Sequence, residues 1–332
     1  MDMKRILFFA LAVLALASCG SSPKSLLPSI SGKAGEVMVV IDRELWEGDL
    51  GSEVRGLLAG ECPYLATKEP LYNLSNVNPA AFADIFRVHR NILMLQVDPQ
   101  VAEPGIIFKT DVWARTQCVI RISAATEEDA VQIVKDNGEK IAGFIEQSER
   151  NRVIGNTLLY EEASIAPQVR EVMGGSPHFP MGYKLKKRTS DFVWVADEKQ
   201  YTNQSVLLYR YPAVGDASDF EVGNIIANRN RILQENVPGM FEGTYMTTSE
   251  FIPPTVSFVH YKGMEFAQTR GYWEVFNDYM GGPFVSHSMY TPDGKEILVA
   301  EAFVYAPRYD KRQYLRQVEA LLYSFEWGKK ED

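Results

Sequence analysis

Histidine and cysteine are scarce in this 332-residue sequence, with four and three copies. No two histidines stand four residues apart, so the spacing of a zinc site on one helix is missing. The motifs GxGxxG after a strand, GxxxxGK[ST] and GxSxG are also absent. A catalytic site assembled from distant residues is not excluded by these absences, but they make an enzyme the weaker hypothesis. We therefore predict no metal site, no cofactor and no catalytic residues.

Positive charge is also in short supply, because 34 Lys and Arg residues face 43 Asp and Glu residues, giving a net charge of −9. Phosphate binding requires clustered Lys and Arg, so nucleic acid is not an expected partner. The densest basic segment alternates with Tyr183 and Leu185, which predicts the polar side of an exposed strand. Its basic residues are Lys184, Lys186, Lys187 and Arg188.

Too few cysteines are present for a disulfide framework. Apart from Cys19, only Cys62 and Cys118 occur. The two could pair in an oxidising compartment, but their separation is unknown from sequence. Because Cys118 lies in the apolar segment 117–122, a buried and inert thiol is the favoured interpretation.

No hydrophobic run in the N-terminal segment is long enough to span a bilayer. The apolar run from Ile6 to Ala17 has 12 residues, about 18 Å of helix against a hydrocarbon core of roughly 30 Å. With Lys4 and Arg5 before it, the run has the layout of a secretory signal. We predict a signal peptide over residues 1–18.

The residues at the end of this signal resemble the bacterial lipobox, Leu16-Ala17-Ser18-Cys19. The resemblance implies cleavage before Cys19 and acylation of that cysteine, with palmitate-type chains that hold the protein permanently to a membrane. An ordinary secretory cleavage with a nearby cysteine is the alternative. A flexible tether is predicted over residues 19–31. Lipoproteins displayed on the cell surface often carry an acidic export tag directly after the acylated cysteine, and residues 20–25 contain no acidic side chain. We therefore expect a periplasm-facing protein of the outer membrane.

The remainder predicts an α+β fold of two tandem units, 32–152 and 153–332, with mainly antiparallel sheets and packed helices. An echo between residues 54–64 and 169–178 raises the hypothesis that the units are related. In the first unit we expect strands at 36–42, 91–97 and 117–123. A helix is predicted after Asn78-Pro79, and another after Thr126 with four inward positions: Ala130, Val134, Ile141 and Ile145.

The second unit is expected to close with an antiparallel meander. Its strands are predicted at 270–279, 284–290 and 296–305, with tight turns at Gly281-Gly282-Pro283 and Pro292-Asp293-Gly294. Earlier strands are expected at 192–195 and 205–211, and a long helix at 219–236. A final helix carries Leu315, Val318, Leu322 and Phe325 on one side.

The segment 270–287 is the candidate binding surface because it is rich in aromatic and charged residues. Tyr272, Glu274, Phe276 and Asp278 would alternate on one face of a strand and could meet a sugar or a partner loop. The simpler interpretation places Trp273 and Val275 in the core and leaves the first face solvated. The candidate residues are Arg270, Tyr272, Trp273, Glu274, Asp278 and His287.

Two isolated polar residues lie on apolar helix stripes. His89 could be a ligand or base, but a core histidine bonded to a backbone carbonyl is the more common case. Arg229 could bind an anion, although an interdomain salt bridge or a snorkelling side chain is favoured.

Three motifs of the second unit are Arg270-Gly271-Tyr272-Trp273-Glu274-Val275, Met280-Gly281-Gly282-Pro283-Phe284-Val285 and Phe303-Val304-Tyr305-Ala306-Pro307. They resemble lipoproteins of the Bacteroides phylum that share a domain of unknown function catalogued as 4837. The resemblance runs from about Gly32 to Trp327, and Tyr272 stands where the pattern has Leu. It implies an envelope lipoprotein and no established activity. The chain's end is also similar to small α/β domains of the photosystem-subunit and Mog1-like type, a fold analogy only.

Three hypotheses on function follow. The favoured one is a non-enzymatic envelope lipoprotein that binds a ligand, an envelope protein or a glycan in the periplasm. The second is a glycan-processing or other hydrolase using Glu274 and Asp278, with His287, although carboxylates four residues apart on one strand are about 13 Å apart, too far for a glycosidase pair. The third is a structural spacer.

Overall fold

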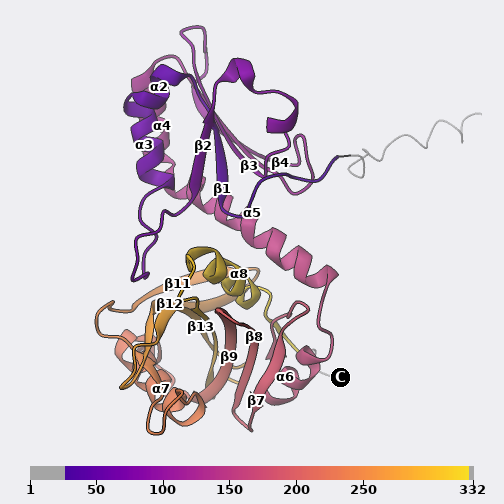
Figure 1. The fold of residues 1–332 in the computed structure, drawn as a ribbon, viewed down its shortest axis with the longest axis vertical. Coiled ribbons are helices and arrows are strands. Elements are labelled where there is room, and N and C mark those ends of the chain that lie inside the picture. Colours follow the sequence, from indigo (N-terminus) through magenta and orange to yellow (C-terminus); the bar gives the residue numbers. More distant parts are fainter. Residues whose placement is uncertain (1–26, 329–332) are drawn as a thin grey trace, which may run out of the picture.

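The computed structural model describes residues 27–328 and has an α+β fold in which each of two units is built around its own sheet (Figure 1). The long helix α5 (Gly138–Leu159) leads from the first unit to the second. The predicted unit junction at 152/153 falls inside this helix and stays a prediction. Cys19 and the signal peptide lie outside the described residues. Within 27–328, no helix is both long and apolar enough to cross a membrane.

The first sheet has the strand order β2-β1-β3-β5-β4. Neighbouring strands are parallel from β2 through β5, and only the edge strand β4 is antiparallel. Antiparallel pairs prevail among the strands of residues 27–328, as predicted, but this sheet departs from that pattern. The uninterrupted apolar run of β1 could have indicated a parallel sheet, since strands buried on both faces are typical of parallel sheets. The strands are β1 (Glu36–Val40), β2 (Asn73–Val77), β3 (Asn91–Val97), β4 (Gly105–Thr110) and β5 (Cys118–Ala124).

Helices cover one face of this sheet: α2 (Arg43–Glu47), α3 (Asp49–Leu58), α4 (Glu127–Asp136) and α5. The hydroxyl of Thr126 caps α4 by accepting the Asp129 N–H at 3.1 Å, as predicted. All four predicted inward positions are buried in the core. However, the helix expected to run through them is two helices, because α4 ends at Asp136, Asn137 leaves the helical conformation, and α5 begins at Gly138.

The opposite face is covered by short segments instead of the predicted helix after Asn78. Asn78 does cap the Ala80 N–H, but only two 3-10 turns follow, η2 (Pro79–Ala81) and η3 (Asp84–Phe86). Asp84 has φ of 39°, which interrupts any α-helix. His89 accordingly lies outside a helix, where its ring Nδ1 bonds the Asn91 carbonyl at 3.1 Å, as a core histidine would.

The second sheet is antiparallel, in the order β10-β12-β13-β14-β9-β8-β7, with β11 also paired to β12. The predicted meander is confirmed, because β12, β13 and β14 pair in sequence. The predicted tight turn at Gly281-Gly282-Pro283 is wrong, because these residues begin β13 and pair with β12. The chain turns at 276–280 instead, where Asn277 has φ of 60°. The strand β7 forms an exposed edge with a bulge, in agreement with its basic composition. The strands are β7 (Lys184–Arg188), β8 (Phe192–Lys199), β9 (Thr202–Pro212), β10 (Met246–Thr248), β11 (Thr255–Tyr261), β12 (Met264–Val275), β13 (Gly281–Tyr290) and β14 (Glu296–Tyr305).

Helices pack on both faces of this sheet. One face packs against α6 (Ile165–Met173) and α8 (Arg312–Leu322), and the other against α7 (Val222–Asn236) with η4 (Ala217–Phe220) before it. A two-strand ribbon of β6 (Gly175–Ser176) and β15 (Glu326–Trp327) ends the fold. The four predicted apolar positions near the C-terminus are buried, although Phe325 lies beyond the end of α8.

The two units do not share a topology. The sequence echo corresponds only to similar helix ends, since α3 and α6 both finish within it. A mostly parallel sheet in one unit and an antiparallel sheet in the other do not support the hypothesis of related units.

Arg229 is not at an interdomain contact. It is fully buried inside the second unit, where its Nε and Nη2 donate to the two carboxylate oxygens of Glu301 at 2.9 and 2.7 Å. Its Nη1 donates to Thr248, and its guanidinium stacks 3.9 Å from the Phe284 ring centroid. The prediction of an interdomain bridge or a snorkelling side chain is therefore wrong, because a carboxylate on β14 lies beneath α7.

Candidate functional site

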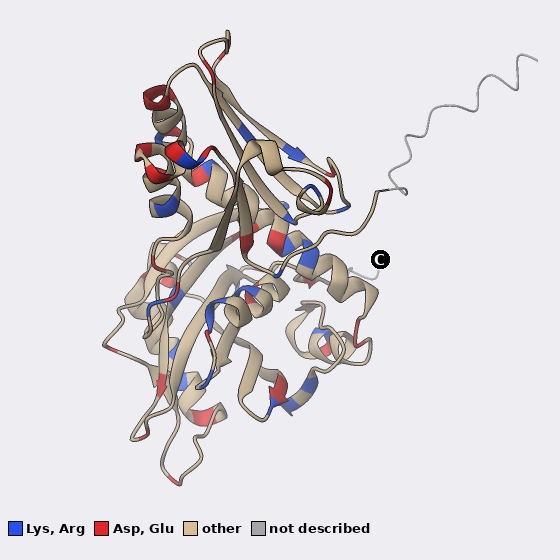
Figure 2. Cartoon of the chain, turned by 45° about the horizontal axis from the view of Figure 1, so that its top comes forward, with Lys and Arg blue, Asp and Glu red and all other residues tan. Residues whose placement is uncertain are grey.

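A cavity of about 270 Å³ lies between the two units. The segment between α3 and β2 supplies Cys62 and Tyr72, and α5 supplies Glu146. From the second unit, β12 contributes Arg270 and α8 contributes a row of residues one turn apart. Figure 2 shows charged residues of both signs on the helices that meet at this junction. The row on α8 is Arg312, Leu315, Arg316 and Glu319.

Arg316 connects the units across the cavity. Its Nε donates to the Glu146 carboxylate at 2.9 Å, and its Nη2 donates to the Leu71 carbonyl. The guanidinium also lies 4.6 Å from the Tyr72 ring centroid. Although burial opposes the charge, Glu146 outweighs that effect and raises the pKa of Arg316. This arginine is therefore fully satisfied by the protein.

Arg312 is less completely paired. Arg312 is only 5% exposed. Among residues 27–328, no carboxylate forms an ion pair with its guanidinium, and its Nε has no acceptor. Its Nη1 donates to the Pro70 carbonyl. The nearby Glu69 uses its two oxygens to accept the backbone N–H groups of Lys311 and Arg312, each at 2.8 Å. Burial and the neighbouring Arg316 lower the pKa of Arg312.

Arg270 is the one predicted surface residue that lines this cavity. It donates to the Glu319 carboxylate and, through Nε, to the Gln268 amide oxygen at 3.1 Å. Burial disfavours its charge, but Glu319 more than compensates and raises its pKa. The cavity wall thus holds three guanidinium groups and two carboxylates, and Arg312 is the guanidinium with no carboxylate within ion-pair distance. Glu69 and Asp310 offset only part of the lowering of its pKa.

The other ionisable groups of the wall are protonated at neutral pH. Burial raises the pKa of the Cys62 thiol in spite of the nearby arginines. Burial and Glu146 raise the pKa of Tyr72, whose hydroxyl donates to Glu146 at 2.7 Å. Both Cys62 and Cys118 are free thiols, and Cys118 is buried in the core of the first unit.

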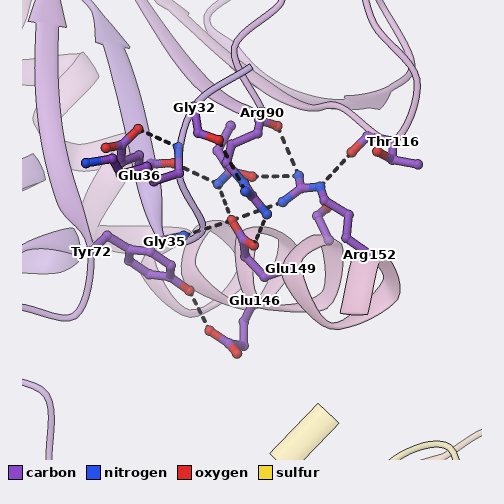
Figure 3. Close-up of polar contacts among 12 residues, drawn as sticks. Gly32, Gly35, Glu36, Tyr72, Arg90, Thr116, Glu146, Glu149 and Arg152 are labelled. Atoms are coloured by element: carbon purple, nitrogen blue, oxygen red, sulfur yellow. Dashed lines mark hydrogen bonds and ion pairs between the residues drawn. The ribbon is translucent and has the colours of Figure 1, made fainter. Parts of the chain in front are cut away.

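A buried ion network lies one helical turn away on α5 (Figure 3). Glu149 is almost fully buried and accepts hydrogen bonds from Arg90 at 2.6 Å and Asn91 at 2.7 Å. Arg152 lies 3.0 Å from the same carboxylate, and the Gly35 N–H donates to it at 3.2 Å. Burial opposes ionisation, but the two arginines and these donors lower the pKa of Glu149. Because the partners begin β1 and β3, the network fixes α5 to the sheet.

Comparison with known proteins identifies the family of the second unit. Residues 162–324 match the family model DUF4837, a domain of unknown function. The second unit belongs to this family. Residues 30–157 match a different model of unknown function, DUF8532, so the resemblance inferred over residues 32–327 divides between two families. Residues 3–19 match the prokaryotic membrane lipoprotein lipid attachment site, which supports a lipid anchor at Cys19.

The search of curated proteins found no match. Among solved structures, a single-residue mutant of the protein Mog1 is similar at 8% identity and a TM-score of 0.30, covering 46% of this chain and 90% of that chain. A likeness at that TM-score carries no argument about fold or function.

The remaining predicted surface residues do not form one site. Trp273 and Val275 are core residues on the α7 face, as the simpler interpretation had it. Tyr272 and Glu274 are half-buried on the opposite face, and Asp278 follows the end of β12. The predicted strand to residue 279 is thus too long, because β12 ends at Val275. Whether these residues bind a partner stays a prediction.

His287 is enclosed in the second unit. Its ring stacks on Phe266 with centroids 4.0 Å apart, and Gln268 bonds its Nε2 at 3.2 Å. Burial, with the positive charges of Arg270 and Arg150, lowers its pKa well below the ordinary value. In register, His287 pairs with Gln268 while Glu274 pairs with Gly281. Six residues of strand, about 20 Å, therefore separate His287 from Glu274.

Sequence reasoning missed most of the cavity. Arg312 and Arg316 are one turn apart on an amphipathic helix, which could have indicated a shared face. Nothing in the sequence indicates that Glu146 and Tyr72 meet that face from another unit. Within residues 27–328, no group of His, Cys, Asp and Glu side chains is arranged to hold a metal ion.

Proposed function

We propose that the mature protein is an envelope lipoprotein, held by acylated Cys19 on the periplasmic face of the outer membrane, that binds a small anionic ligand between its two units. The ligand would carry a carboxylate or phosphate group. The lipid attachment match supports the anchor. The acidic balance of the whole chain makes the local excess of positive charge at the cavity distinctive.

The observation that carries the proposal is the buried guanidinium of Arg312. A buried charge costs several kcal/mol unless it is paired and hydrogen-bonded. Arg316 and Arg270 each have a carboxylate partner, whereas Arg312 has one carbonyl and an Nε with no acceptor. A carboxylate or phosphate matches the guanidinium in both charge and geometry. Ligand sites also occur preferentially at domain interfaces.

The same groups support binding without turnover. Guanidinium groups do not act as bases, because they are not deprotonated in proteins. The Cys62 thiol has a raised pKa, and both wall carboxylates are held by arginines. The alternative hydrolase would need Glu274 and His287 to act together, and their separation along β12 does not favour it.

Substituting Arg312→Gln is expected to weaken anion binding by about tenfold or more, the usual size of a lost charge-assisted hydrogen bond. Isothermal titration calorimetry with inorganic phosphate and with succinate would measure the dissociation constants. Lys311→Gln is the matched control, because it removes the same charge next in sequence but does not line the cavity. Equal affinities for Arg312→Gln and the unsubstituted protein, or no binding of either anion, would contradict the proposal.

A further inference from the structure

The C-terminal end of α5 is an uncharged, apolar tip. Residues 153–160 contain no charged side chain, and Figure 2 shows this end of the helix in the neutral colour. Leu158, Leu159 and Tyr160 are exposed, Leu159 by 78%. Met181 is 68% exposed and joins them through its N–H, which donates to the Tyr160 carbonyl at 2.9 Å. These four residues are the apolar tip.

The apolar tip lies beside the point where the N-terminal segment reaches the body. Ser29 and Ile30 line the same surface depression as Leu159, together with Arg115. Ser29 is bridged to Arg115, and Ser31 to His89, so residues 29–31 pair with the first unit instead of extending the predicted flexible tether. In Figure 1 the coloured segment that precedes β1 and the end of α5 are on the same side of the molecule.

The short chain between the lipidated Cys19 and the first described residues limits how far those residues can be from the bilayer. From Cys19 to Leu27 is eight residues, which span at most about 29 Å when fully extended. Leu27 is therefore held within that distance of the bilayer, and Ser29, two residues further on, within about 36 Å. A tether this short gives the apolar tip a high effective concentration at the membrane, so that weak contacts are enough for docking.

We propose that the apolar tip docks on the bilayer that holds the Cys19 lipid, with its side chains in the interfacial layer. Leucine and methionine side chains gain from burial at the boundary between headgroups and acyl chains. Tyrosine is also favoured there, because its ring is apolar and its hydroxyl can remain in contact with water. The next residue, Glu161, turns its carboxylate to His178 at 2.6 Å. Docking of the apolar tip is independent of the proposed anion site, because none of its four residues lines the cavity.

A depth measurement on the lipidated protein tests the docking. Leu159→Cys and Met181→Cys would each be labelled with the fluorophore NBD in a Cys62→Ser background, since Cys118 is buried. The protein would be reconstituted into phosphatidylethanolamine and phosphatidylglycerol vesicles. Met240→Cys is the control, because Met240 is also 78% exposed but lies in the loop after α7.

The expected result is a blue-shifted emission and quenching by doxyl-labelled lipids at positions 159 and 181, with neither change at 240. Equal responses at all three positions, or no quenching at 159 and 181, would overturn the proposal. Blue-shifted emission at 159 and 181 without doxyl quenching would also overturn it, and would assign the apolar tip to a contact with another protein copy. Substituting Leu159→Asp in the Met181→Cys protein should abolish the quenching at 181.

Discussion

Substituting Glu301→Gln is expected to destabilise the second unit by about 3–5 kcal/mol, the usual result when one partner of a buried ion pair is removed. Arg229 and Glu301 are both fully buried, and Gln keeps the shape of the side chain while removing its charge. The guanidinium of Arg229 would then be left between Thr248 and Phe284 without a counter-ion. Urea unfolding followed by tryptophan fluorescence would measure the change.

The control for this substitution is on the same strand. Glu296→Gln breaks a pair with Arg210 at 3.0 Å, but that pair is partly exposed and should cost less than about 1 kcal/mol. The double substitution Arg229→Met with Glu301→Leu should recover most of the loss, because apolar side chains can replace a buried pair. A Glu301→Gln effect no larger than that of Glu296→Gln would refute the interpretation.

Substituting Glu149→Gln is expected to destabilise the first unit by about 3 kcal/mol or more. The carboxylate is shared by Arg90 and Arg152, so its loss leaves two largely buried side chains, 13% and 8% exposed, without a counter-ion. Chemical denaturation monitored by circular dichroism would report the change. Glu139→Gln, an exposed position on the same helix, should change the free energy of unfolding by less than about 0.5 kcal/mol.

The pH dependence distinguishes this network from a packing effect. The pKa of Glu149 is lowered from its ordinary value of 4.5 in the folded protein, so its contribution is complete above about pH 4.5. That contribution is lost as the pH falls through the lower folded value. The stability difference between the unsubstituted protein and Glu149→Gln should therefore shrink below pH 4.5. A difference that stays constant down to pH 3 would indicate lost packing instead.

Local signals predicted the elements whose ends are chemically marked. Thr126 begins α4 because its hydroxyl caps the helix, and Pro292-Asp293-Gly294 marks the turn between β13 and β14. The turn between β12 and β13 was misplaced, because it uses Asn277 at positive φ and not the glycines that follow. The segment after Asn78 failed because a cap and a proline start a turn but do not ensure an α-helix, and Asp84 adopts a positive φ. The parallel pairing of the first sheet was not predicted either, since strand pairing depends on contacts distant in sequence.

The cavity could not be predicted for the same reason. Arg316 and Glu146 are 170 residues apart, and Arg312 contacts Pro70 across 242 residues. Only the packing of α8 against α5 brings them together. The aromatic segment around Trp273 was predicted as a binding surface because its composition is unusual, but several of its apolar residues are buried in the core. Arg270 was among the predicted residues because it belongs to this segment, and only the structure shows that it faces Glu319 of α8.

Native mass spectrometry of the lipoprotein, extracted from cell envelopes in mild detergent, tests the central claim most directly. The account predicts one small anionic adduct on the unsubstituted protein and on Lys311→Gln, and its loss from Arg312→Gln. The absence of any adduct, or an adduct retained by Arg312→Gln, would contradict an anion site between the two units.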